Sequence, residues 1–137
     1  MDSYEDCIIF LLAKAYQRGH AELKKRLEPF GLTPLQQLIL AALEQEEGPS
    51  AGEIGKRLVL DNATLSGTLD RMAEKGLIRK ESDPSDKRML RVRLTPKARA
   101  LSQSLGQARQ ESNEEILSRL SLEEKLLLKR LLRDLQV

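Results

Sequence analysis

The segment 61–75 carries side chains of the types that read the edges of base pairs. Its polar positions hold short hydroxyl and amide side chains and one arginine, namely Asn62, Thr64, Ser66, Thr68 and Arg71. A helix that only faces solvent more often carries Glu and Lys. A helix that enters the major groove of DNA needs low bulk together with hydroxyl, amide and guanidinium groups. This pattern indicates a surface for duplex DNA; the alternative is a polar surface that happens to have short side chains.

A second polar group lies in residues 83–88, which read Asp-Pro-Ser-Asp-Lys-Arg. We expect Arg88 to enter a minor groove, where narrow A·T-rich segments concentrate negative potential. Asp86 lies two residues earlier and can hold and aim this guanidinium through a charge-assisted hydrogen bond. The alternative for this segment is an ordinary polar hairpin turn.

The residues around segment 61–75 predict the helix that must carry its polar face. Asp61 is a good N-cap because its carboxylate can accept hydrogen bonds from the free amides of the first turn. Apolar residues recur at a helical spacing, at Leu65, Leu69 and Met72, which gives one buried face. Gly76 is suited to the left-handed conformation that ends many helices.

A shorter helix is predicted just before it. Ser50 and Glu53 form a capping box at its start, and Ile54 and Leu58 lie on its inner side. Residues 58–60 form the turn into Asp61. Two helices of these lengths joined by a short turn are typical of a helix-turn-helix.

Two strands are predicted after the second helix. The first begins at residues 77–78, and in the second strand Leu90, Val92 and Leu94 alternate with Arg91 and Arg93. This period of two indicates a strand with one apolar and one wet, basic face. The two strands form a hairpin with residues 83–88 at its tip. Residues 33–96 are therefore predicted to form a winged helix-turn-helix, and the fold class is mainly α with a small β-hairpin wing.

Helices are also predicted on both sides of this lobe, within a single chain of residues 1–137. They cover residues 4–28, residues 97 to about 120, and the leucine-rich C-terminal segment from Ser121 onward, where Ser121 and Glu124 form a capping box. The first and last of these are apolar on more than one face, which would be an aggregation hazard in a monomer. We expect residues 1–30 and 97–137 to form a dimerisation lobe. The alternative is packing within one subunit.

The charge distribution agrees with a local surface for a polyanion. The chain has a formal net charge of only +2, but residues 56–99 contain 12 Lys and Arg against 6 Asp and Glu, a net charge of +6. The remaining residues contain 11 against 15, a net charge of −4. A basic middle between acidic flanks favours one binding surface over general stickiness. The alternative is a solvated charged face.

Several function classes are disfavoured by the composition. With one His, one Cys, no Gly-rich phosphate loop and no plausible triad, we expect no enzyme, no cofactor and no metal site. Lys14 interrupts the N-terminal apolar run, which also lacks the basic start of a signal peptide, so we expect no membrane association and a cytoplasmic location. The scarcity of aromatic residues disfavours a binder of single strands.

The sequence resembles the MarR family of bacterial transcription regulators over nearly its whole length. The resemblance rests on the Leu-Asp-Arg-Met segment that ends in Met72, the Gly-Leu-Ile segment that begins at Gly76, the Asp-x-Arg motif of Asp86 and Arg88, and the Leu-Thr pair that closes the wing. The chain departs from the family at Ala98, where a Gly often follows Lys, and at Gly67, where a larger residue is frequent.

The resemblance implies a homodimer that binds double-stranded DNA at a pseudo-palindromic operator and usually represses transcription. It places the helix 61–75 in the major groove and the wing residues 83–88 in the minor groove. It also implies that a small phenolic or lipophilic effector, or an oxidant, releases the DNA. The residues that we expect to contact DNA are Ser50, Asn62, Thr64, Ser66, Thr68, Arg71, Asp86, Lys87, Arg88 and Arg91.

Two alternatives to an effector-controlled DNA-binding regulator remain open. A winged-helix module can bind protein without binding DNA specifically. Some members of the family sense peroxide through a cysteine near the start of the first helix, paired with tyrosines, and Cys7 lies in that region. The segment 33–38 has no tyrosine, so the expected state of Cys7 is a buried, inert thiol.

Overall fold

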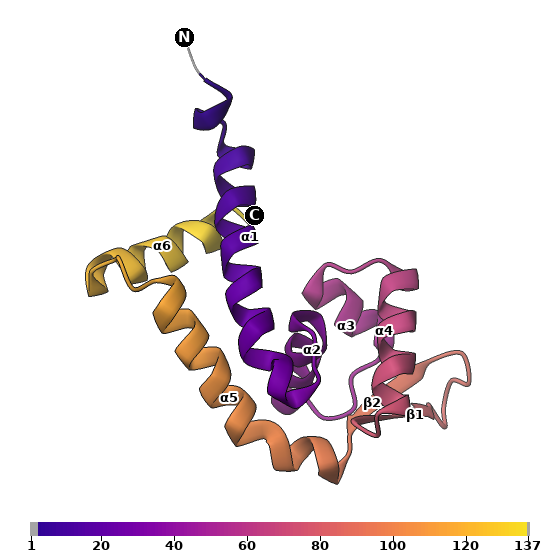
Figure 1. Ribbon diagram of the computed structural model, residues 1–137. Coiled ribbons are helices and arrows are strands. Elements are labelled where there is room, and N and C mark those ends of the chain that lie inside the picture. The colour runs from indigo at the N-terminus through magenta and orange to yellow at the C-terminus, as the bar shows by residue number, and fades with distance from the viewer. Residues whose placement is uncertain (1–2, 137) are drawn as a thin grey trace. The chain divides into compact units, whose positions relative to one another are not determined.

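The computed structural model describes residues 3–136, and these residues form six α-helices, two 3-10 turns and one two-stranded sheet. In chain order the elements are η1 (Tyr4–Asp6), α1 (Ile8–Leu27), η2 (Glu28–Phe30), α2 (Pro34–Gln45), α3 (Ala51–Leu58), α4 (Asn62–Glu74), β1 (Ile78–Ser82), β2 (Leu90–Leu94), α5 (Pro96–Ile116) and α6 (Leu122–Asp134). They belong to two compact units (Figure 1). Leu27–Gly106 form one unit, and the described residues before and after this range form the other.

The unit Leu27–Gly106 contains the predicted winged helix-turn-helix. Helix α3 packs on α4, α4 packs on β1, and β2 contacts both α2 and α3. The most deeply buried residues of this core are apolar side chains from the end of α1 and from α2, α3, α4, β2 and α5. They include Leu27, Ile39, Leu40, Ile54, Leu69, Met72, Val92 and Leu105. The predicted fold class, mainly helical with a hairpin wing, is confirmed.

The helix starts follow the predicted caps, with one difference. Thr33 closes a full capping box with Gln36, and Asp61 accepts a hydrogen bond from the amide of Thr64. Ser50 accepts from the amide of Glu53 at 3.1 Å. The carboxylate of Glu53 does not complete the box that we expected. It lies 3.8 Å from the guanidinium of Arg91, where a cation attracts it more strongly than a neutral amide would.

The sheet pairs β1 with β2 in antiparallel register, from Ile78 opposite Leu94 to Ser82 opposite Leu90. A third segment joins its edge just before α3. Ser50 forms an isolated bridge with Arg91, and the amide of Val92 donates to the carbonyl of Pro49 at 3.0 Å. The base of the wing is therefore attached to the start of the helix-turn-helix.

Four residues of this unit have a left-handed conformation, and two of them follow the helices α3 and α4. Gly76 has φ 75°, as expected for a residue that follows a helix. Val59, between α3 and α4, has φ 54° and an exposed fraction of 89%. A β-branched residue in this region is an outlier.

The other unit contains most of α1, the end of α5, and α6. Helix α1 begins at Ile8 and not at Tyr4 as predicted, because Cys7 is extended (ψ 126°) and ends the short turn η1. Helix α5 ends at Ile116, before the predicted end near residue 120. Within this unit Arg26 pairs with Glu22 at 2.7 Å and with Glu111 of α5 at 3.0 Å.

The helices of this unit leave many apolar side chains exposed. Within residues 4–16 the large exposed apolar side chains are Tyr4, Ile8, Ile9, Leu11 and Tyr16. In α6 and just after it they are Leu122, Leu126, Leu127, Leu131, Leu132 and Leu135. Cys7 is also exposed in the single chain, so the expected burial of its thiol is wrong for one subunit. No helix within residues 3–136 combines the length and the apolar character that crossing a membrane requires.

Candidate nucleic-acid interface

The exposed side of α4 presents most of the predicted polar face. Asn62, Thr64, Ser66 and Arg71 are exposed, while Leu65 and Leu69 are buried beneath them. The side chains of Asn62, Thr64 and Ser66 are small, which leaves the backbone of α4 close to the surface. The arrangement therefore offers an amide, hydroxyl groups and a guanidinium on one convex helix face, as major-groove readout requires.

The cap of α4 restricts what Thr64 can do. Both its amide and its hydroxyl donate to the carboxylate of Asp61, each at 2.8 Å. These two bonds, with the amide bond the larger cause, hold the pKa of Asp61 below its usual value. Asp61 stays ionised at neutral pH. The hydroxyl of Thr64 is therefore left as an acceptor, which suits an amino group of a base.

Thr68 lies elsewhere than predicted, because it is buried and not on the exposed face. Its hydroxyl donates to the carbonyl of Thr64 at 2.7 Å, the usual bond of a helical Thr to the preceding turn. Thr68 is next to Leu69, at the edge of the buried stripe of α4. We expected it to be exposed because its side chain is polar. Its oxygen accepts a long hydrogen bond from Arg71 at 3.4 Å.

Gly67 lies beside the guanidinium of Arg71. A Cβ at position 67 would be 3.4 Å from a terminal nitrogen of the Arg71 guanidinium, so the arginine lies over the bare backbone of the glycine. A Cβ there would be in van der Waals contact with Arg71 on the exposed side of α4.

The tip of the wing presents Arg88 to solvent. Its side chain is 94% exposed, and its backbone amide and its Nε approach one oxygen of Asp86 at 3.0 and 3.5 Å. Lys87 is exposed beside it. The predicted contact between Asp86 and Arg88 is therefore present, and the rest of the guanidinium projects outward.

The side chain of Arg91 forms hydrogen bonds within the wing and with the loop before α3. Its Nε donates to Asp83 at 3.0 Å, and a terminal nitrogen donates to the carbonyl of Gly48 at 3.3 Å. Asp83 also accepts from the hydroxyl and amide of Ser85, at 2.6 and 2.8 Å. The bonds from Ser85, followed by the bond from Arg91, lower the pKa of Asp83 to about 2. The predicted wet face is wrong for Arg91, which is partly buried among these partners.

Ser50 is likewise occupied within the fold. It is 8% exposed, caps α3 and bridges to Arg91. Ser50, Thr68 and Arg91 are thus the three predicted contact residues that lie away from the exposed side of α4 and from the wing tip. The other seven lie on the exposed side of α4 or at the wing tip.

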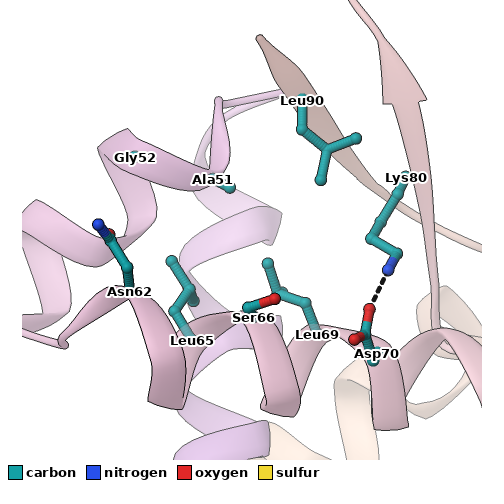
Figure 2. Close-up of a pocket in the computed structure, with 9 residues that line it drawn as sticks. All are labelled: Ala51, Gly52, Asn62, Leu65, Ser66, Leu69, Asp70, Lys80 and Leu90. Carbon is teal, nitrogen blue, oxygen red and sulfur yellow. Dashed lines mark hydrogen bonds and ion pairs between the residues drawn. The ribbon is translucent and has the colours of Figure 1, made fainter. Parts of the chain in front are cut away.

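An open pocket of about 200 Å³ lies between α4, the start of α3 and the hairpin. Figure 2 shows Asn62 and Ser66 on the α4 side and Leu90 of β2 on the opposite side. Lys80 of β1 points to Asp70 of α4, with which it forms an ion pair. Sequence reasoning missed this pair. The signal was available, because strand alternation places Lys80 on the same face as Ile78, toward α4.

No group of three His, Cys, Asp or Glu side chains that could hold a metal ion occurs within the part of the chain that the structure describes. The elements, their order and the polar face of α4 define a winged helix-turn-helix protein. The sequence model of the MarR family matches residues 32–90. The chain belongs to the MarR family of winged helix-turn-helix transcriptional regulators, which is a family of regulators and not of enzymes.

Two relatives are similar over most of this chain. The transcriptional regulator TtmR of Methylorubrum extorquens is 38% identical over 101 residues, 74% of this chain and 50% of that protein. The transcriptional repressor NicR of Pseudomonas putida is 35% identical over 91 residues, 66% of this chain and 58% of that protein. The chain therefore matches only half to three fifths of the length of these relatives.

Solved structures match nearly the whole chain. A probable transcriptional regulator from Pseudomonas aeruginosa is 35% identical with a TM-score of 0.90, covering 97% of this chain and 99% of its own. BpsR of Bordetella bronchiseptica, whose DNA binding is regulated by 6-hydroxynicotinic acid, is 27% identical with a TM-score of 0.93, covering 99% and 97%. A cysteine-to-serine variant of MarR from E. coli, in complex with operator DNA, is 26% identical with a TM-score of 0.88, covering 98% and 99%.

Proposed function

We propose that this chain is a transcriptional repressor that binds double-stranded operator DNA as a homodimer. Helix α4 lies in the major groove, and the tip 83–88 lies in the minor groove. The observation that carries the proposal is the small polar face of α4 in the same unit as the projecting Arg88. The similarity to a MarR solved with operator DNA supports it.

The first experiment selects DNA from a randomised or genomic library with the purified protein and sequences the bound pool. We expect an inverted repeat whose half-sites lie about one helical turn apart. Binding should weaken steeply with salt, because each neutralised phosphate releases condensed counterions. If the chain is instead a module that binds protein and not DNA, no sequence motif should be enriched, even at low salt.

The wing assignment is tested separately by Arg88→Ala. It should weaken operator binding by about 1–3 kcal/mol, while Arg119→Ala, an exposed arginine in the other unit, should leave it unchanged. The side chain of Arg88 is almost fully exposed, so its loss should not disturb the fold. If Arg88→Ala binds the operator as tightly as the wild type in a gel-shift titration, the placement of the wing tip in the minor groove is wrong.

We propose that residues 33–96 are the DNA-binding lobe and that residues 1–30 and 97–137 are the dimerisation lobe. The exposed apolar side chains of residues 4–16 and of α6 support this division, because burial against a second copy would remove them from water. Leu126 is 62% exposed in the single chain. Leu126→Asp should therefore spare the core of the subunit and weaken the dimer.

Sedimentation analysis of Leu126→Asp tests this division. Lys129→Asp, an exposed charge change on the same helix, is the control and should remain dimeric. A monomeric wild-type protein at micromolar concentration, or a Leu126→Asp variant that dimerises as tightly as the wild type, would contradict the assignment.

We also propose that a small phenolic or lipophilic effector controls release of the DNA. The support is the similarity to BpsR, for which 6-hydroxynicotinic acid regulates DNA binding. Fluorescence anisotropy of the protein–operator complex, titrated with 6-hydroxynicotinic acid and with simple phenols, tests this. We expect a saturable release that added salt of equal ionic strength does not reproduce.

A further inference from the structure

Three arginines line an open pocket at the base of the wing. The pocket has a volume of about 140 Å³ and is bounded by residues 47–48, both strands of the hairpin and the start of α5. Arg79 comes from β1, Arg93 from β2 and Arg99 from α5. Glu47 is the acidic residue among those that line it. Cations from three separate elements thus surround one small volume.

Arg79 and Arg93 extend from the face of the hairpin that points away from α4. Arg79 and Arg93 are directly opposite each other in the sheet register. Lys80, the next residue on β1, pairs with Asp70 of α4. Since successive side chains of a strand point to opposite faces, Arg79 and Arg93 lie on the other face. The pocket is therefore separate from the groove between α4 and the wing.

The charges in the pocket are incompletely compensated. Like charges directly opposite each other across a sheet are destabilising. Arg93 has Glu81 as a partner at 3.0 Å. Within residues 3–136, the side chains of Arg79 and Arg99 form no hydrogen bond and no ion pair with another residue. Two guanidinium groups at the pocket are therefore available to an external anion.

The third guanidinium is held in place. Glu81 binds the Nε of Arg93, which leaves its terminal nitrogens for another partner. A Cβ on Gly48 would be 2.8 Å from the guanidinium carbon and 2.8 and 2.9 Å from the two terminal nitrogens, so the guanidinium lies against the backbone of Gly48. Gly48 has φ +63°, a conformation that a side chain would strain. A fixed, planar donor of this type suits bidentate binding of oxygen anions.

We propose that this pocket binds a small anion with two or more charged oxygens, carried by a phosphate or a carboxylate group. Arg93 would orient the anion, and Arg79 and Arg99 would neutralise it. Such a ligand would connect α5, the hairpin and the loop before α3. It would therefore act on the position of the wing without entering the groove beside α4.

The test uses calorimetric titration of the full chain, without DNA, with inorganic pyrophosphate and with malonate as probes. Sodium chloride of matched ionic strength serves as the reference. We expect saturable binding of at least one probe, and the preferred probe distinguishes a phosphate ligand from a carboxylate ligand. Arg79→Gln and Arg99→Gln should each weaken binding by about fivefold to tenfold.

The control is Arg119→Gln, which removes an exposed arginine of the other unit and should leave the affinity unchanged. Neither Arg79 nor Arg99 has a partner to lose, so both variants should fold as the wild type does. Absence of saturable binding, or equal affinities for all variants, would overturn the proposal. So would variants that weaken DNA binding and reduce its salt dependence but leave the anion titration unchanged. Because the titration contains no DNA, its failure is independent of the proposed repressor function.

Discussion

The backbone conformation of Val59, in the turn between α3 and α4, predicts that a substitution to glycine stabilises the protein. Val59 is the non-glycine residue with positive φ among residues 3–136, at φ 54° and ψ 55°. Its amide donates to the carbonyl of Gly55, which fixes the end of α3. The left-handed conformation brings a Cβ too close to the following carbonyl oxygen, and branching at Cβ adds to the crowding. The substitution Val59→Gly should therefore stabilise the fold.

The magnitude follows from three contributions. Relief of the left-handed strain is worth about 1–2 kcal/mol. The greater freedom of glycine in the unfolded chain opposes it by about 0.5–1 kcal/mol. Loss of apolar burial is negligible, because Val59 is 89% exposed. The net effect is a stabilisation of about 0–1.5 kcal/mol, which raises Tm by up to about 5 °C for a chain of this size.

Urea unfolding of the full chain measures this difference. Ala63→Gly is the matched control, because Ala63 is also exposed but lies within α4, where glycine should destabilise by about 1 kcal/mol. Val59→Asn should stabilise without the added freedom of glycine, since Asn tolerates the left-handed region. A Val59→Gly variant that is less stable than the wild type would refute the assignment of strain to this turn. If the strain is retained for function, operator affinity by anisotropy should fall while stability rises.

Three further substitutions test the same physical reasoning. Ser112 is 1% exposed and its hydroxyl has no hydrogen-bond partner among residues 3–136, so Ser112→Ala should stabilise by about 1 kcal/mol in urea unfolding; destabilisation would indicate a bound water. Gly67→Ala should stabilise α4 by about 0.5–1 kcal/mol in urea unfolding, because the new Cβ meets only the flexible end of Arg71; destabilisation would show that Arg71 cannot accommodate it. Asp83 has a folded pKa of about 2, below its unfolded value. Its contribution to stability is therefore present at neutral pH and lost as the pH falls through the range between these two values, and Asp83→Asn should lack this part of the acid dependence of unfolding.

Local signals predicted the elements that carry the interface. The caps at Thr33, Asp61 and Ser121 depend on residues within three positions of each other, so the sequence alone contains both partners. The turn at Gly76 and the alternation in β2 are local in the same sense. The contact of Asp86 with Arg88 was predictable for this reason as well, since only two residues separate them.

Two of the locations that sequence reasoning missed depend on contacts between different elements. Arg91 alternates with apolar residues as a solvent-facing side chain would, but Gly48, which is 43 positions away, supplies one of its acceptors. The pair between Lys80 and Asp70 joins a strand to a helix. The prediction for Thr68 was wrong because its hydroxyl donates a hydrogen bond to the preceding turn of its own helix, and this bond permits burial of the polar side chain.

These contacts explain how a short hairpin can hold its tip in a defined position. A two-stranded hairpin by itself is marginally stable in water. Here the face toward α4 is attached by Lys80 to Asp70, and the opposite face is attached through Arg91 to the loop at Gly48. The paired strands between these attachments are fixed on both sides, whereas Arg88 at the tip is 94% exposed. A change that loosens either attachment should therefore alter the aim of Arg88 without altering its charge, and operator affinity should respond while the long-range electrostatic attraction to DNA does not.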